Sequence, residues 1–151
     1  MVLEIQTGEK NPVLRKISTS VEKFDKGLKN FCADLLETML KKDGVGLAAP
    51  QVGRNERVIA IRLLGKRSEQ DVRELVMVNP EILERSLKTA VDEEGCLSLP
   101  GILLKIERAE EIKVRFCSPK GEELVLVYTD LPARIIQHEV DHLEGILICD
   151  Y

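Results

Sequence analysis

The only two histidines in this chain of 151 residues stand four positions apart, in the stretch QHEVDHLEG at 137–145. If this stretch is helical, His138 and His142 lie one turn apart on the same face, so both imidazoles can bind one metal ion. Glu139 lies beside them, where its carboxylate can exchange a proton with a metal-bound water. A pair of surface histidines on an amphipathic helix is the alternative interpretation. We favour the metal site because the chain has no other histidine.

A catalytic metal site of this kind has three protein ligands and one open coordination position. The tail after His142 is short, and its donors are poorly placed. Glu144 would point to another part of the helix, whereas Cys149 and Asp150 are crowded against the end of the chain. The third ligand is therefore expected upstream of the histidines.

The stretch DEEGCLSLPG at 92–101 is the best upstream source of that ligand. Cys96 follows a glycine, which lets the backbone turn or approach closely, and a Pro-Gly turn comes soon after it. Cys32 and Cys117 are interpreted as small buried hydrophobic residues, a reading that also stays open for Cys96. A thiolate with two imidazoles favours Zn²⁺ or Fe²⁺ over Mg²⁺ or Ca²⁺.

A third segment, GVGLAAPQVG at 44–53, is built almost entirely of small and apolar residues. It is not a phosphate loop, because no Lys-Ser or Lys-Thr follows its glycines. It is either a tight connection beneath the core or a place where the backbone approaches a ligand. Gln51 is its one polar side chain able to donate a hydrogen bond, which makes it a candidate to stabilise an oxyanion.

These segments must be positioned by regular elements, and the first is a predicted amphipathic helix between Thr19 and Lys42. Apolar residues recur there at spacings of three and four, which is typical of one helix face. Thr19 and Glu22 can form a capping box at its start, and Gly44 provides a stop at its end. The apolar face contains Val21, Phe24, Leu28, Phe31, Leu35 and Met39.

The middle of the chain reads as short strands followed by a second helix. That helix is predicted over 131–144, with Asp130 as its N-cap, Pro132 in its first turn and Gly145 at its end. The turn SPKGEE at 118–123 suits a β-hairpin. A helix, then several strands, then a helix indicates an α+β fold with antiparallel sheet. The strands are predicted at 57–64, 74–80, 111–117 and 123–128.

The composition fits one globular domain over residues 1–151, with 44% hydrophobic and 32% charged residues. A formal net charge of -4 and only 3% aromatic residues argue against nucleic-acid binding. No apolar run is long enough for a membrane span, and the N-terminus has no secretion signal. We therefore expect a cytoplasmic protein with reduced cysteines.

Together, GVGLAAPQ (44–51), EGCLS (94–98) and QHEVDHLEG (137–145) resemble the three signature motifs of the peptide deformylase family. Their order and spacing agree as well, and the resemblance runs over nearly the whole chain. It implies antiparallel β-sheets packed around a C-terminal metal-binding helix, with an N-terminal amphipathic helix. The implied activity is hydrolysis of the N-formyl group from the formylmethionine of newly synthesised polypeptides, which releases formate.

The resemblance also implies roles for individual residues at the metal. Cys96, His138 and His142 hold one divalent ion, natively Fe²⁺, with Zn²⁺, Ni²⁺ or Co²⁺ as substitutes. Glu139 is the general acid/base. Gln51 and the backbone N–H of Leu97 hold the tetrahedral oxyanion, and such a donor is typically worth about 10²–10³ in rate.

For the substrate, the resemblance implies an extended peptide that pairs with the backbone of Gly44, Val45 and Gly46 and with the region after Cys96. Its methionine side chain enters an apolar pocket. By position, that pocket is expected to be lined by Val45, Leu97, Leu131, Ile135 and the aliphatic part of Arg134.

Two further expectations concern charged residues near the metal. Glu94 is expected to pair with Arg108 and so to anchor the loop that carries Cys96. Arg134 lies one helical turn before His138, so its guanidinium is expected near the mouth of the methionine pocket. Its stem should pack along the pocket wall while its head reaches water, an acidic partner or a substrate carbonyl.

The expected partners are nascent formylmethionyl peptides and the ribosome exit region, and the protein is expected to be a monomer. Two alternatives stay open. One is a general HExxH metallopeptidase that cuts internal peptide bonds, and the other is a deformylase-like module that binds without turnover. A purely structural zinc site would need four closed ligands, and the sequence offers three.

Overall fold

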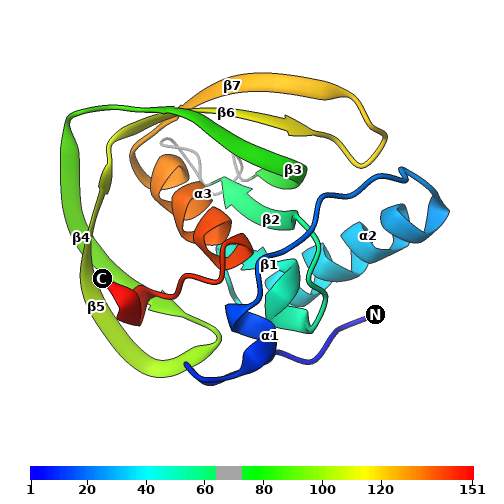
Figure 1. The fold of residues 1–151 in the computed structure, drawn as a ribbon, viewed down its shortest axis with the longest axis horizontal. Helices are drawn as coiled ribbons and strands as arrows, with labels where there is room; N and C mark the ends of the chain where they lie inside the picture. The colour runs from blue at the N-terminus through cyan, green and yellow to red at the C-terminus, as the bar shows by residue number, and fades with distance from the viewer. Residues whose placement is uncertain (64–72) are drawn as a thin grey trace.

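The computed structural model describes residues 1–63 and 73–151, which form an α+β fold of two antiparallel sheets and a long C-terminal helix (Figure 1). The larger sheet has five strands in the order β1-β2-β3-β6-β7, and β4 pairs with β5 in a separate hairpin. The strands are β1 (Gly46–Ala48), β2 (Val58–Leu63), β3 (Arg73–Arg85), β4 (Thr89–Cys96), β5 (Leu99–Ala109), β6 (Glu111–Cys117) and β7 (Glu123–Thr129).

All four predicted strands are present, with differences at their ends. The predicted strand at 57–64 is β2, and Leu64 lies outside the described residues. The strand predicted at 74–80 continues to Arg85. Its pairing with β6 shifts register between Val78 and Glu81, so Pro80, which has no N–H to donate, does not interrupt the sheet. The expected hairpin turn joins β6 to β7, with Gly121 at φ 91°.

The β4–β5 hairpin was not predicted. Its strands are joined by a tight turn at Leu97 and Ser98, whereas a turn was expected at Pro100 and Gly101. A shift in the pairing register between Glu94 and Cys96 marks a bulge at the end of β4. Bulges re-aim side chains, so this irregularity helps to set the direction of the Cys96 side chain, while Cys96 stays paired with Leu99.

The first long helix is α2 (Lys26–Lys41), and it begins later than predicted. Asp25 caps it by accepting a hydrogen bond from the Leu28 N–H at 2.9 Å. The expected capping box is wrong, because Thr19 instead forms a β-bridge with Glu56. At the other end the helix stops before Gly44, as expected, and Asp43 takes the left-handed conformation at φ 53°.

The second long helix is α3 (Asp130–Leu143), where a helix was expected. Thr129 occupies the N-cap position that was assigned to Asp130. Gly145 ends the helix at φ 73°, and its missing side chain lets the Arg15 backbone pass directly against it. The short helices are α1 (Pro12–Arg15), η1 (Ala49–Val52) and η3 (Ile148–Asp150).

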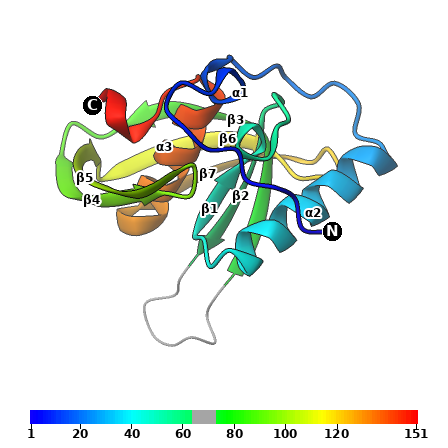
Figure 2. The ribbon, with the colours of Figure 1, turned by 90° about the horizontal axis from the view of Figure 1, so that it is seen from below.

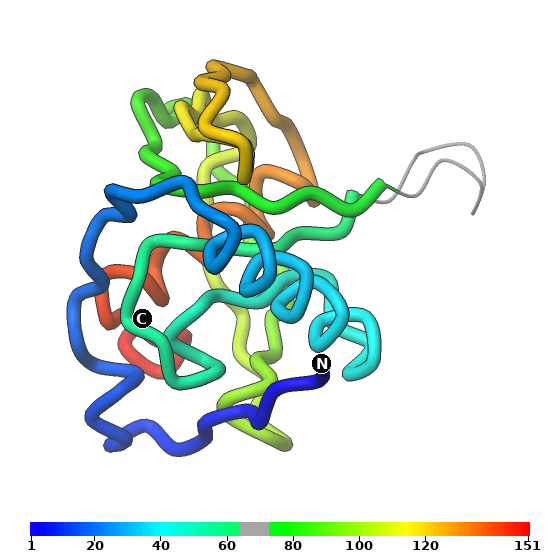
Figure 3. Tube along the Cα trace, turned by 90° about the vertical axis from the view of Figure 1, so that its right-hand side faces the viewer, coloured from blue at the N-terminus to red at the C-terminus, as the bar shows by residue number. Residues whose placement is uncertain are grey.

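Strands β1 to β3 of the larger sheet are covered on both faces, which explains their apolar sequence, whereas β7 is largely exposed (Figures 1 and 3). Along β2, Ile59 and Ile61 pack on the α3 side, whereas Val58 and Ala60 pack on the α2 side. Figure 2 shows α3 between the larger sheet and the β4–β5 hairpin. The fold therefore places one helix against the strand end that carries Cys96. None of the described helices is long and apolar enough to cross a membrane.

Candidate metal centre

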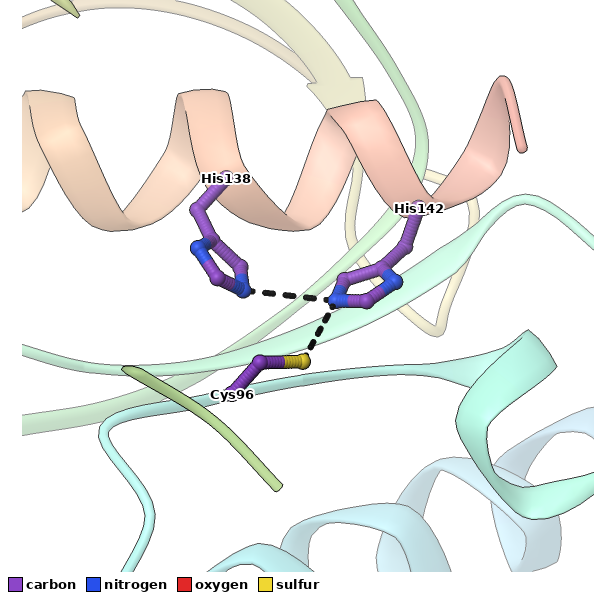
Figure 4. Close-up of side chains that lie close together, drawn as sticks. All are labelled: Cys96, His138 and His142. Atoms are coloured by element: carbon purple, nitrogen blue, oxygen red, sulfur yellow. Dashed lines mark hydrogen bonds between the residues drawn. The ribbon is translucent and has the colours of Figure 1, made fainter. Parts of the chain in front are cut away.

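The structure brings Cys96, His138 and His142 together in one cluster (Figure 4). Their donor atoms all lie within 4.8 Å of one another. The Nε2 atoms of the two histidines are 3.3 Å apart, and Cys96 Sγ lies 3.4 Å from His142 Nε2. At this spacing, all three donor atoms can bind a single metal ion placed between them. Among the described residues, no other group of this kind is found.

The cluster is buried, so the surface-histidine interpretation is wrong. His142 is 2% exposed, and burial lowers its pKa well below the ordinary value, which keeps the imidazole in the neutral form that binds metals. Burial also works against a charged His138, but Cys96 and Glu94 raise its pKa to about 10.

The other donors considered in the sequence lie elsewhere. Cys32 lies on the buried face of α2, where burial raises its pKa to about 11. Cys117 is half-buried at the end of β6. Cys149 and Asp150 both contact the guanidinium of Arg15, at 3.8 Å and 2.5 Å.

The expected pair of Glu94 and Arg108 is present and buried. Arg108 donates through Nε and Nη2 to the two carboxylate oxygens at 2.7 Å and 2.8 Å. Glu94 also lies 2.8 Å from His138 Nδ1, a contact that was not predicted. Burial alone would raise the pKa of Glu94, but Arg108 and His138 outweigh it and lower that pKa to about 2. An ionised Glu94 thus holds the outer nitrogen of His138 and leaves Nε2 facing the cluster.

Glu139 lies next to the cluster without belonging to it. Its Oε1 is 3.8 Å from His138 Nε2, and its Oε2 is buried with no hydrogen-bond partner. Burial raises the pKa of Glu139 to about 7. A carboxylate with this pKa and a free oxygen can both accept and return a proton near neutral pH.

Gln51 approaches the cluster from η1. Its Oε1 accepts a hydrogen bond from the Ala48 N–H at 2.9 Å, which fixes the orientation of the amide. Its Nε2 lies 3.6 Å from Cys96 Sγ and donates to Ser98 Oγ at 3.1 Å. The sequence reasoning missed this partner, although Ser98 stands inside the EGCLS stretch.

One cavity of about 710 Å³ opens onto the cluster. Leu131, at 45% exposure, contributes to its wall, as do five residues of β5 that were not predicted. The residues expected to contact the substrate all line it, as do Gln51, Cys96, His138 and Glu139; they are Gly44, Val45, Gly46, Leu97, Leu131, Arg134 and Ile135. The five residues of β5 are Leu99, Pro100, Gly101, Ile102 and Leu103.

Arg134 lines the cavity, and its side chain is 10% exposed. Of the three destinations expected for its guanidinium, the structure shows the acidic partner, which is Glu94 Oε2 at 2.6 Å. Helical spacing correctly placed Arg134 on the face of His138, but the partner belongs to a hairpin that was not predicted.

Asp141 and the exposed Tyr151 extend this network to the surface, and neither was predicted to take part. Arg108 Nη1 donates to Asp141 Oδ2 at 2.8 Å and to the Tyr151 hydroxyl at 3.2 Å. That hydroxyl in turn donates to Asp141 at 2.6 Å. The sequence offered one indication of this role, because Asp141 is a charged residue within the metal-binding stretch QHEVDHLEG.

Comparison with known proteins gives one family throughout. The sequence model of the family described as polypeptide deformylase matches residues 2–151. A peptide deformylase from Thermotoga neapolitana is 46% identical over 140 residues, which cover 93% of this chain and 81% of that protein. The crystal structure of peptide deformylase from Thermotoga maritima superposes with a TM-score of 0.91 at 43% identity, covering 99% of this chain and 97% of the other.

A third relative was solved with a peptide bound. It is the class I type b peptide deformylase from Acinetobacter baumannii in its Met-Ala-Ser complex, with a TM-score of 0.90 and 39% identity. That match covers 99% of this chain and 98% of the other.

Proposed function

This chain belongs to the peptide deformylase family, whose members remove the formyl group from N-terminal methionine, and we propose how its own residues carry out that hydrolysis. Residues 1–151 act as a single catalytic domain, in which α3 is the metal-binding helix. We propose that the protein acts as a monomer.

Cys96, His138 and His142 hold the metal ion on which this family depends. The donor set fits such an ion, because a thiolate and two imidazoles suit Fe²⁺, Zn²⁺, Ni²⁺ and Co²⁺. We propose Fe²⁺ as the native ion. When bound, it supplies Lewis-acid chemistry and lowers the pKa of a water ligand from 15.7 to about 7.

Glu139 moves the proton. Its free Oε2 takes a proton from the attacking water and later gives it to the departing amine nitrogen of methionine. Burial raises the pKa of Glu139 to about 7, which supports both steps. Near neutral pH the carboxylate form can accept a proton, and the carboxylic acid form can return it.

Gln51 and the backbone N–H of Leu97 hold the formyl oxygen as negative charge develops on it. The support is geometric, because the Ala48 N–H fixes the Gln51 carbonyl and so aims its Nε2 towards Cys96 and Ser98. Donors fixed before the reaction cost no reorganisation when the charge appears.

The substrate lies extended along Gly44–Gly46 and the turn after Cys96, with its methionine side chain in the cavity between Leu97 and Ile135. Met-Ala-Ser in the Acinetobacter relative supports a peptide with N-terminal methionine at this site. Nascent chains in the cytoplasm, near the ribosome exit region, are the source of such formylated ends.

One observation carries the proposal: a Cys/His/His cluster beside an unpartnered buried glutamate opens onto an apolar cavity. The test is formate release from formyl-Met-Ala after anaerobic iron loading, with metal analysis of the same sample. Met-Ala and acetyl-Met-Ala serve as controls. Cleavage of unformylated peptides would indicate a metallopeptidase instead, and binding without formate release would indicate a binding module.

Cys96→Ser is expected to weaken metal retention by about 100-fold or more. A hydroxyl is a harder and poorer ligand than a thiolate, and loss of residues that merely support ligands already costs about 10–100-fold. Zinc transfer to a chromogenic chelator measures the effect. Cys149→Ser, which changes a half-buried thiol outside the cluster, is the matched control. If only the control loses metal, the ligand set is wrong.

A further inference from the structure

The guanidinium of Arg134 joins the helix that carries both histidines to the hairpin that carries Cys96. Besides Glu94 of β4, it donates to the Ala90 carbonyl of β4 at 2.8 Å and the Ile106 carbonyl of β5 at 2.9 Å. The proposed metal ligands come from these same two elements. Any shift of the hairpin against α3 changes the distance between the Cys96 thiolate and the imidazoles.

Arg134 also fills the last acceptor position on Glu94. Oε1 of Glu94 contacts Arg108 Nη2 and His138 Nδ1, and its Oε2 contacts Arg108 Nε and Arg134 Nη1. A carboxylate offers about four lone-pair sites, so these four contacts leave it no freedom to rotate. The orientation of Glu94 determines in turn where Nδ1 of His138 is held.

Arg134 supplies the second guanidinium of this network. Arg108 is paired with both Glu94 and Asp141, so two carboxylates would face one guanidinium without Arg134. Glu94 is 7% exposed and Arg134 is 8% exposed, so water cannot replace the lost donor fully. Truncation would also leave the Ala90 and Ile106 carbonyls without these bonds.

We propose that Arg134 is a positioning residue for the metal centre. It fixes Glu94, and through Glu94 the ring of His138, and it clamps the strand end that presents Cys96 against α3. This inference rests on the proposed ligand roles of Cys96 and His138. It differs from a role in the methionine pocket, which Arg134 also lines, and the two roles predict different measurements.

Arg134→Met is the informative variant, because it keeps an unbranched stem against the cavity and removes the guanidinium. We expect the affinity for Zn²⁺, measured by chelator competition, to fall by about 10–100-fold. kcat should fall in the metal-saturated enzyme as well. The visible spectrum of the Co²⁺-loaded protein should change, since it reports ligand geometry. The ratio of kcat/KM for formyl-Met to that for formyl-Phe peptides should stay within about twofold of the wild-type ratio. A change in pocket size by one methylene group would alter this ratio by about 10-fold or more.

Arg134→Lys keeps the charge but lacks the planar fork, so it should lie between the wild type and Arg134→Met in Zn²⁺ affinity. It also serves as the second variant if Arg134→Met does not fold. Arg57→Met is the matched control, because Arg57 pairs with Glu144 at the far end of α3 at 2.5 Å and is not bonded to Glu94. It should leave Zn²⁺ affinity and kcat as in the wild type.

A double-mutant cycle with Glu94→Gln tests whether Arg134 acts through Glu94. The double variant should lose no more Zn²⁺ affinity than the more severe single variant. Three outcomes would each overturn the proposal. The losses of Zn²⁺ affinity could be additive in the double variant. In Arg134→Met, the formyl-Met to formyl-Phe ratio could change while Zn²⁺ affinity stays normal, or neither quantity could change. Wild-type zinc stoichiometry and Cys96→Ser, measured in parallel, show separately whether the ligand set itself is correct.

Discussion

Glu139→Gln is expected to lower kcat by about 10³-fold while the protein keeps its metal. The substitution preserves the shape of a side chain that is 4% exposed, so packing should change little. It removes the ability to take up and return a proton, which the wild-type carboxylate has because its pKa is raised to about 7 and its Oε2 has no hydrogen-bond partner. Formate release under saturating formyl-Met-Ala measures the effect.

Metal content decides how the result is interpreted. Glu139 Oε1 is 3.8 Å from His138 Nε2, and Glu139 is not part of the ligand group formed by Cys96 and the histidines. One metal per chain is therefore expected in both the variant and the wild type. If metal and activity disappear together, Glu139 is itself a ligand and the proposed mechanism fails.

The chemistry of the centre could be predicted from the sequence because its residue types are restrictive. Two imidazoles four residues apart have few uses other than a shared ion, and helical geometry alone brings His138 and His142 together. The long-range part needed the structure or the family resemblance. Spacing favoured Cys96 over Cys149 as the third ligand, but it could not indicate that β4 ends against α3.

The β4–β5 hairpin was missed for a physical reason. Strand prediction relies on alternating apolar and polar residues, whereas Glu94 is the only fully buried residue of β4. A strand whose buried residue is a carboxylate resembles a charged loop. The partner of Arg134 was lost for the same reason, since Glu94 belongs to that hairpin.

The glycine-rich segment shows a similar limit. Composition indicated that the backbone of 44–53 approaches something closely, but not what it approaches. In the structure, Glu139 lies directly over Gly46. A Cβ on Gly46 would come within 2.7 Å of Glu139 Oε1 and 2.8 Å of its Cγ.

Gly46→Ala is therefore expected to reduce kcat nearly as much as Glu139→Gln, by about 10²–10³-fold, without unfolding the protein. The backbone of Gly46 cannot easily yield, because it pairs with Ile61 of β2 and the neighbouring Val45 carbonyl accepts from the Arg62 N–H at 2.8 Å. The Glu139 side chain has rotatable bonds, so it should swing away and take its carboxylate from the reacting water. Formate release and thermal unfolding, measured side by side, separate this loss from a loss of stability.

Two variants distinguish displacement of Glu139 from a direct clash with the substrate, which is proposed to pass along the same backbone. At Gly44 an added Cβ meets Leu97 Cδ1 at 3.2 Å and Met39 Cγ at 3.5 Å, both flexible side chains, so Gly44→Ala should cost much less activity. In the double variant Gly46→Ala/Glu139→Gln, the carboxylate is already inactive, and displacing it further should change nothing. kcat of the double variant should then equal that of Glu139→Gln alone. A further large drop, mainly in kcat/KM, would mean that the methyl group blocks the peptide and that the small size of Gly46 serves binding instead of the base.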